Sequence, residues 1–101
     1  MKGSLITLRA DGGRAVKTFD RPVQLSELQR AVGGYIEEIP RFDRWDGQPC
    51  AAFCNDEGKL KGLRLNHDAT TVWRTLNPAT SDVLVGDVVV VIGDDEFLEA
   101  L

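Results

Sequence analysis

The side chains best suited to chemistry lie close together in the second half of the chain. Within nine residues the sequence places three cationic side chains and two further polar ones: Lys59, Lys61, Arg64, Asn66 and His67. They end where a helix is expected to begin, and the free backbone N–H groups of a helix start favour an anion. Cations beside such groups make charge-assisted hydrogen bonds. The cluster predicts a pocket for an anionic ligand. The alternative is that Lys59 and Lys61 form only a solvated hairpin face.

Three aromatic side chains could stack on the base of such a ligand. They are Tyr35, Trp45 and Trp73, and base stacking on aromatic rings is a common mode of nucleic-acid and nucleotide binding. Trp73 also falls on the apolar stripe of a predicted helix, where a core position is the alternative. Tyr35 and Trp45 therefore join the candidate ligand-binding residues.

Motifs for catalysis are missing. No glycine pair is followed by the Lys-Ser or Lys-Thr of a P-loop, and there is no G-x-S-x-G elbow. His67 is the sole histidine, so the sequence lacks the ligands of a zinc site. Glu37 and Glu38 are neighbours on a predicted strand and point to opposite faces. We expect a protein that is not an enzyme and that uses no metal or cofactor.

The two cysteines, Cys50 and Cys54, are separated by three residues and do not form a C-x-x-C redox pair. On a strand they would face the same side and serve as small hydrophobes. We expect both thiols to be reduced and unpaired, as is usual for a cytosolic protein.

The charge distribution narrows the range of partners. The 101 residues have a net charge of −4. Through residue 74 twelve basic residues face ten acidic ones, which gives +2, whereas the remaining residues carry six acids and no base. An acidic chain argues against binding duplex nucleic acid, which requires a basic footprint.

The longest apolar run, residues 88–92, is far too short to span a bilayer, and residues 1–4 do not resemble a signal peptide. We therefore expect a cytoplasmic protein with no membrane contact.

Alternation and turn residues predict about six strands. They cover residues 5–8, 15–19, 35–39, 49–54, 59–63 and 83–92, the last interrupted by Gly86 and Asp87, which indicate a bulge or turn. Gly58 is expected to take a positive φ in the tight loop before residues 59–63. Residues 41–48 are polar and are expected to form a loop. Residues 88–92 show no alternation, which indicates a central strand with both faces covered.

Two helices and a short third one complete the prediction. Ser26, with Gln29 three positions later, is expected to cap the first helix, which ends at Gly33. Asn66 or Asp68 is expected to cap the second, whose apolar stripe is Ala69, Val72, Trp73 and Leu76. Residues 94–101 can form the third. With too few helices to alternate with the strands, the chain is expected to be one α+β domain over residues 1–101. Its centre would be a mostly antiparallel sheet or half-barrel with two to three short helices.

Several segments resemble a family of small domains of unknown function, family 3846. The segments are Val32-Gly33-Gly34-Tyr35-Ile36-Glu37, the run from Cys54 through Asn55-Asp56-Glu57-Gly58-Lys59-Leu60-Lys61-Gly62 to Leu63, then Asn66, and Val85-Gly86-Asp87-Val88-Val89-Val90. The likeness extends over residues 25–97. Family members commonly have proline where this chain has Arg64. The resemblance implies a small cytosolic accessory protein of phages, plasmids or bacteria, and it brings no established activity.

The expected function is therefore binding. The partner is a host protein or a small anionic ligand such as a nucleotide, and counter-defence by a phage-encoded protein is the context that the resemblance suggests. The alternative is a single-stranded nucleic-acid binder that uses Lys59, Lys61 and Arg64 with exposed aromatics. A homo-oligomer is compatible with either function.

Overall fold

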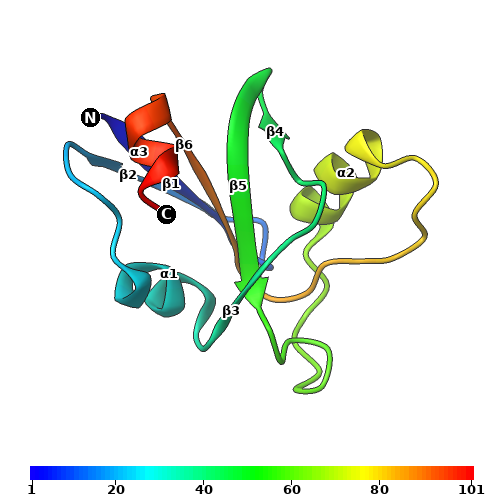
Figure 1. Ribbon diagram of the computed structural model, residues 1–101. Coiled ribbons are helices and arrows are strands. Elements are labelled where there is room, and N and C mark those ends of the chain that lie inside the picture. The colour runs from blue at the N-terminus through cyan, green and yellow to red at the C-terminus, as the bar shows by residue number, and fades with distance from the viewer.

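The computed structural model describes residues 1–101 and has an open six-stranded sheet with three helices (Figure 1). The strands are β1 (Gly3–Leu8), β2 (Arg14–Phe19), β3 (Ile36–Glu38), β4 (Arg44–Trp45), β5 (Gln48–Asn55) and β6 (Val88–Gly93), and the helices are α1 (Leu25–Val32), α2 (His67–Leu76) and α3 (Asp95–Glu99). The strand order is β2-β1-β6-β5-β3, with β4 also paired to β5, and all pairs are antiparallel. The predicted α+β class with a mostly antiparallel sheet is confirmed.

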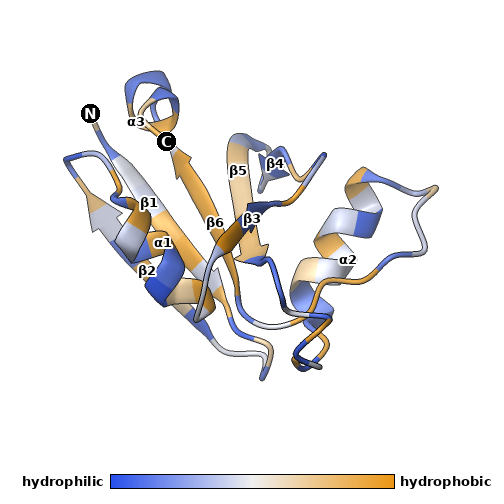
Figure 2. Cartoon of the chain, turned by 60° about the horizontal axis from the view of Figure 1, so that its bottom comes forward, coloured by the Kyte–Doolittle hydropathy of each residue, from blue (hydrophilic) through white to orange (hydrophobic).

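Strand β6 lies at the centre of the sheet and is buried on both faces. Val88, Val89, Val90 and Val91 have no exposed surface, and Figure 2 shows this strand as apolar along its length. Because successive side chains of a strand point to opposite faces, Val88 and Val90 enter one core and Val89 and Val91 enter another. The predicted central strand, residues 88–92, is confirmed, whereas residues 83–85, also expected to belong to a strand, lie outside β6.

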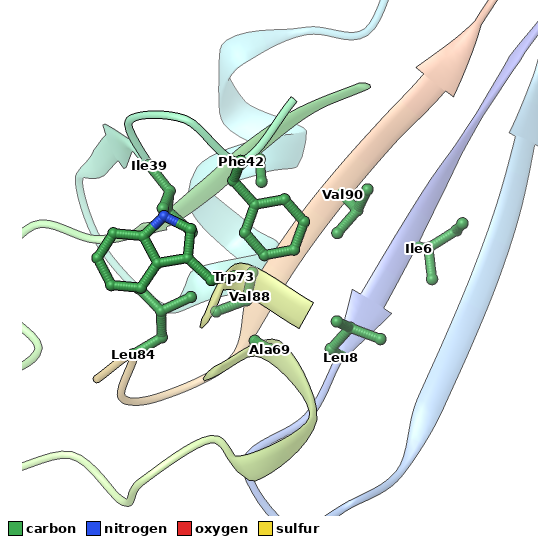
Figure 3. Close-up of a cluster of buried hydrophobic side chains, with 10 residues drawn as sticks. Ile6, Leu8, Ile39, Phe42, Ala69, Trp73, Leu84, Val88 and Val90 are labelled. Atoms are coloured by element: carbon green, nitrogen blue, oxygen red, sulfur yellow. The ribbon is translucent and has the colours of Figure 1, made fainter. Parts of the chain in front are cut away.

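The two faces of the sheet are covered by different elements. Helices α1 and α3 pack on one face, where Leu28, Val32 and Phe97 meet the side chains of β1, β5 and β6. On the other face, α2 contributes Ala69 and Trp73. The connection from β3 to β4 adds Ile39 and Phe42 to this second core (Figure 3). The protein is thus a three-layer arrangement with the sheet in the middle. No helix has the length and apolarity that crossing a membrane requires.

Helix α1 begins two residues earlier than the predicted cap at Ser26 indicated. The residue before the helix is Gln24, and the Glu27 carboxylate accepts a hydrogen bond from the Gln24 N–H at 3.0 Å. Val23 and Leu28 are buried in the same cluster and clamp the helix start, an arrangement known as a hydrophobic staple. The prediction that Ser26 is the cap was wrong because burial of Val23 decides where the chain turns. Gly33 ends the helix with a φ of 76°, as predicted.

Residues 59–63 were predicted to be a strand, and this prediction was wrong because they form none. They belong to a series of turns in which the N–H groups of Lys61, Gly62 and Leu63 donate to carbonyls three to five residues earlier. Positive φ occurs at Gly62 (66°) and not at Gly58. The loop is closely packed at Gly58, since a Cβ there would lie 3.0 Å from a Val85 methyl group. Lys59 and Lys61 therefore do not share a strand face.

The remaining differences are smaller. Residues 41–48 are not all loop, because β4 pairs with the start of β5. Residues 83–87 precede β6 without forming a strand. The bridge between Leu65 and Val85 and the hydrogen bonds of Leu84 and Gly86 with Asn66, Thr70 and Arg64 join them to the body. Gly86 turns the chain into β6 with a φ of 74°, which confirms the turn expected there.

Candidate functional site

The fold divides the predicted site residues among four places. The loop of residues 56–64 has two sides: Lys61 and Arg64 line depressions beside α1, and Lys59 lines a cavity beside α2. Asn66 is fully buried, and His67 is exposed at the start of α2. Trp45 lies on β4, where the Arg14 guanidinium stacks 5.4 Å from the ring centre. The seven candidates therefore do not converge on one pocket.

Two adjoining depressions bring Lys61 and Arg64 together with Arg30, a residue that the sequence analysis did not single out. Their volumes are about 390 and 520 Å³, and they share Arg30, Gly33 and Lys61. Arg64 lines the first and Tyr35 the second. We call this pair of depressions the basic hollow. Its lining residues are Ala10, Gln29, Arg30, Ala31, Val32, Gly33, Gly34, Tyr35, Asn55, Glu57, Lys61, Leu63, Arg64, Gly86 and Asp87.

The three cations of the basic hollow have no acidic partner. Ion pairs in the protein engage Arg14, Lys17, Arg21, Lys59 and the N-terminus, but not Arg30, Lys61 or Arg64. Two carboxylates line the hollow. The Asp87 carboxylate accepts a hydrogen bond from the Ala10 N–H at 3.0 Å, and Glu57 lies on the Tyr35 side. Three cations against two acids leave the hollow with a net positive charge in a protein that is acidic overall.

Buried Asn55 holds the wall of the hollow in place. Its amide donates to the Val32 carbonyl at 3.2 Å, and its side-chain oxygen accepts from the Glu57 N–H at 2.9 Å. One side chain thereby ties the end of α1 to the start of the loop. Gly34 allows this contact, because a Cβ there would lie 2.7 Å from the Asn55 amide nitrogen. Arg30, in the last turn of α1, and Lys61, on the loop, line both depressions.

Asn66 holds the other side of the hollow in place by hydrogen bonds. It also caps α2, for which Asn66 or Asp68 was predicted. Its amide donates to the carbonyls of Leu8 and Gly86 at 2.8 and 2.9 Å, and its oxygen accepts from the Ala69 N–H at 3.0 Å. The Gly86 N–H donates to the Arg64 carbonyl at 2.7 Å. Asn66 therefore positions Arg64 and has no free polar atom with which to touch a ligand.

Of the three aromatic candidates, only Tyr35 lies beside the cations. It is 69% exposed and follows the Gly33-Gly34 corner at the end of α1. Trp73 is a core residue (Figure 3). Its indole N–H donates to the Pro40 carbonyl at 2.8 Å. Arg30 could have been suspected from the sequence, because it precedes the same Gly-Gly corner that precedes Tyr35.

A second cavity, of about 440 Å³, lies on the opposite side of the loop. Its walls are half apolar and include Ile39, Leu60, Trp73, Val83 and Leu84, and its rim carries Glu37, Asp56, Lys59 and Asp82. We call it the acidic-rimmed cavity. The Lys59 ammonium pairs with the Asp82 carboxylate. The hydrogen bond from Lys59, together with one from the Val83 N–H, lowers the pKa of Asp82.

The cysteines are unpaired, and both are partly buried. Burial raises the pKa of each thiol to about 11, with added contributions from Asp43 near Cys50 and from Glu37 near Cys54. The Cys50 thiol donates to the Phe42 carbonyl at 3.5 Å. Because thiolates are the reactive form, both side chains are poor nucleophiles at neutral pH. No group of three or more His, Cys, Asp or Glu residues could hold a metal ion.

These features define a small three-layer α+β domain with one basic and one acidic-rimmed depression on either side of a single loop. The chain belongs to the family described as domain of unknown function (DUF3846), which it matches over residues 1–99. Comparison with curated proteins and with solved structures gave no match. The resemblance noted in the sequence is thereby confirmed, and the family description names no activity.

Proposed function

We propose that this protein acts by binding and not by catalysis, and that its ligand is a small anion of the nucleotide class held in the basic hollow. The observation that carries the proposal is the grouping of Arg30, Lys61 and Arg64, three cations without an acidic partner, around adjoining depressions. Cations that converge without partners are suited to phosphate, which they bind by charge-assisted hydrogen bonds.

Tyr35 supports the choice of a nucleotide over a simple anion. Its ring is exposed at the edge of the same hollow, where it can stack on a base while the cations hold the phosphate. The two depressions measure about 390 and 520 Å³ and are open to solvent, so a bound nucleotide would keep one side exposed.

The experiment is calorimetric titration of the protein with mononucleotides, cyclic oligonucleotides and short single strands. The Lys61→Glu/Arg64→Glu variant removes two of the three cations. Each desolvated contact of this kind contributes roughly 1.5–3 kcal/mol, so affinity is expected to fall by about a hundredfold or more. Solvated charges would contribute less than about 1 kcal/mol each, and their loss would change affinity little.

The matched control is Lys2→Glu/Arg44→Glu. Both residues are exposed, neither side chain forms an ion pair, and the change in net charge is the same. If the control weakens binding as much as the test variant, the effect is one of overall charge and the hollow is not the site. If the parent binds none of the ligands, the anion site is wrong and a host protein becomes the better partner.

Binding of single-stranded nucleic acid is the second candidate, because Tyr35 beside three cations also fits one nucleotide of a longer strand. The two candidates differ in their salt dependence. A strand that contacts several cations releases several counterions, so its affinity falls steeply with salt. A mononucleotide confined to the hollow shows a shallow dependence and raises the melting temperature of the protein by mass action.

The biological setting is part of the proposal. The family resemblance implies small accessory proteins of mobile elements in the cytoplasm, and a protein that captures a nucleotide could there serve counter-defence against a host signal. A native mass spectrum of the protein purified from its host would show a retained nucleotide or host protein, as well as the number of copies in the assembly.

A further inference from the structure

The acidic-rimmed cavity and the edge of the sheet beside it form a second surface, which shares only Asn55 with the lining of the basic hollow. Strand β3 ends the sheet, with β5 on one side and no strand on the other (Figure 1). The Tyr35 carbonyl accepts a hydrogen bond from the Asp56 N–H, and the Ile39 N–H donates to the Ala52 carbonyl. Since residues of an antiparallel pair alternate, Glu37 bonds to β5 while the N–H and C=O groups of Ile36 and Glu38 point outward.

The cavity lies next to this free edge, because side chains at the edge of the sheet line it. Glu37 and Ile39 line the cavity, as does Cys54, which pairs with Glu37 across the strands. A further strand added to β3 would direct every second side chain toward the same face of the sheet. Free main-chain groups beside a pocket for alternate side chains are the two elements of strand-addition binding.

Leu60 shows that the rim of the cavity has an apolar surface without a partner. It is 86% exposed, more than any other large hydrophobic side chain in the protein. Trp73, Val83, Leu84 and Ile39 supply the apolar wall below it.

The charges around the cavity indicate which kind of segment fits. Three carboxylates, Glu37, Asp56 and Asp82, line it with a single ammonium, that of Lys59. Lys59 already pairs with Asp82, and Glu37 and Asp56 form no ion pair. Charged residues on an edge strand also discourage unspecific pairing. An incoming strand with acidic side chains would be repelled, and one with basic side chains would be attracted.

We propose that the free edge of β3 binds an extended segment of a partner protein, with an apolar side chain in the acidic-rimmed cavity and a lysine or arginine two positions away on the same face. The main-chain groups of Ile36 and Glu38 hold the segment, Trp73 and Leu60 contact its apolar side chain, and Glu37 and Asp56 pair with its cations.

The test uses acetylated and amidated pentapeptides and a Trp45→Phe protein, in which Trp73 is the sole tryptophan and reports on the cavity. The probe peptide is Lys-Ser-Leu-Ser-Lys, and the controls are Glu-Ser-Leu-Ser-Glu and Lys-Ser-Ser-Ser-Lys. We expect the probe to shift the Trp73 emission saturably at concentrations up to about 1 mM, a range suited to so small a contact, and each control to bind at least tenfold more weakly. No saturable shift, or equal binding of the acidic control, would overturn the proposal.

Two protein variants separate the role of the cavity carboxylates from that of the free main-chain groups of β3. Glu37→Gln/Asp56→Asn should weaken binding of the probe at least tenfold, and Asp95→Asn/Glu99→Gln on α3 is the control with the same change in net charge. Glu38→Pro removes an outward N–H without removing a bond to β5, and proline is tolerated on such an edge. It should abolish binding while the melting temperature stays near that of the parent.

If Glu38→Pro alters the fold, hydrogen exchange in the parent provides the same information. Saturation with the probe should slow exchange of the Ile36 and Glu38 amides at least tenfold, because a bound strand covers them. Unchanged exchange at both amides would show that the segment does not add to β3, and the proposal would be wrong.

Discussion

The loop of residues 56–64 separates two surfaces of opposite character. On one side the basic hollow gathers Arg30, Lys61 and Arg64 beside an exposed tyrosine. On the other side the acidic-rimmed cavity has three carboxylates, one paired lysine and a half-apolar wall. Lys59 and Lys61 are two residues apart and yet belong to different surfaces. The comparison shows that a run of like charges in a sequence need not form one site, because turns can direct alternate side chains to opposite sides of a loop.

Both surfaces depend on the same central strand, and the largest expected effect comes from disrupting it. Val90→Asp places an unpaired carboxylate in the core that also contains Trp73 and Ile39, and we expect it to destabilise the protein by roughly 3–5 kcal/mol. Urea denaturation measures the change. The control is Val16→Asp on edge strand β2, where the side chain is 66% exposed. Equal stability of Val90→Asp and the parent would show that β6 is not buried.

Asn66 joins parts of both surfaces, because its side chain donates to Gly86 in the hollow and caps α2, which carries Trp73 of the cavity. Asn66→Ala leaves the buried Leu8 and Gly86 carbonyls without their donor and removes the cap of α2. We expect a loss of about 2–4 kcal/mol in the free energy of unfolding and weaker nucleotide binding through displacement of Arg64. The comparison variant is His67→Ala at an exposed position, which should change stability by less than about 0.5 kcal/mol. A small effect of Asn66→Ala would mean that water replaces its hydrogen bonds.

We next expect the hollow and the cavity to bind their ligands independently of each other. Lys61→Glu/Arg64→Glu should lower affinity for the nucleotide by about a hundredfold while binding of the Lys-Ser-Leu-Ser-Lys peptide stays within a factor of about three. Glu37→Gln/Asp56→Asn should show the opposite pattern. Titrating both ligands against both variants measures the four affinities. Parallel losses in one variant would indicate a single continuous site across the loop.

The smallest effect concerns acid stability, through Glu27 at the start of α1, the helix whose last turn lines the hollow. The hydrogen bond from the Arg21 guanidinium, followed by that from the Gln24 N–H, lowers the pKa of Glu27 to about 2 from its ordinary 4.5. A carboxyl whose pKa is lower in the folded state stabilises the protein above its unfolded pKa, and this contribution is lost as the pH falls. The loss should therefore occur between about pH 4.5 and pH 2.

Glu27→Gln tests this expectation because glutamine also suits this position of a capping box. The variant should be less stable than the parent at pH 7 and should show a smaller decline between pH 4.5 and pH 2, as measured by urea denaturation at each pH. Parallel curves for the two proteins would contradict the assignment. Hydrogen exchange should locate the acid-induced loss in α1, which carries Arg30, and not around Trp73.

Local patterns in the sequence determined most of the secondary structure. The unbroken apolar run at Val88 to Ile92 identified the buried central strand, and the spacing of Ala69 and Trp73 identified the buried face of α2. Gly33 ended α1 as expected, because glycine readily adopts the left-handed conformation there. These features depend on residues within one or two turns of each other, so a short stretch of sequence contains the whole signal.

Tertiary structure alone decided which charges meet. Arg30 joins Lys61 because Asn55 ties the end of α1 to the loop, and Lys59 leaves the group because Asp82, 23 residues away, pairs with it. A Cβ at position 58 would come within 3.0 Å of a Val85 methyl group, so the turns of residues 56–63, where a strand was predicted, lie close to a segment far along the chain. Contacts between residues so far apart in the chain leave no periodic signal in the sequence, and they arise only when the sheet brings the segments side by side.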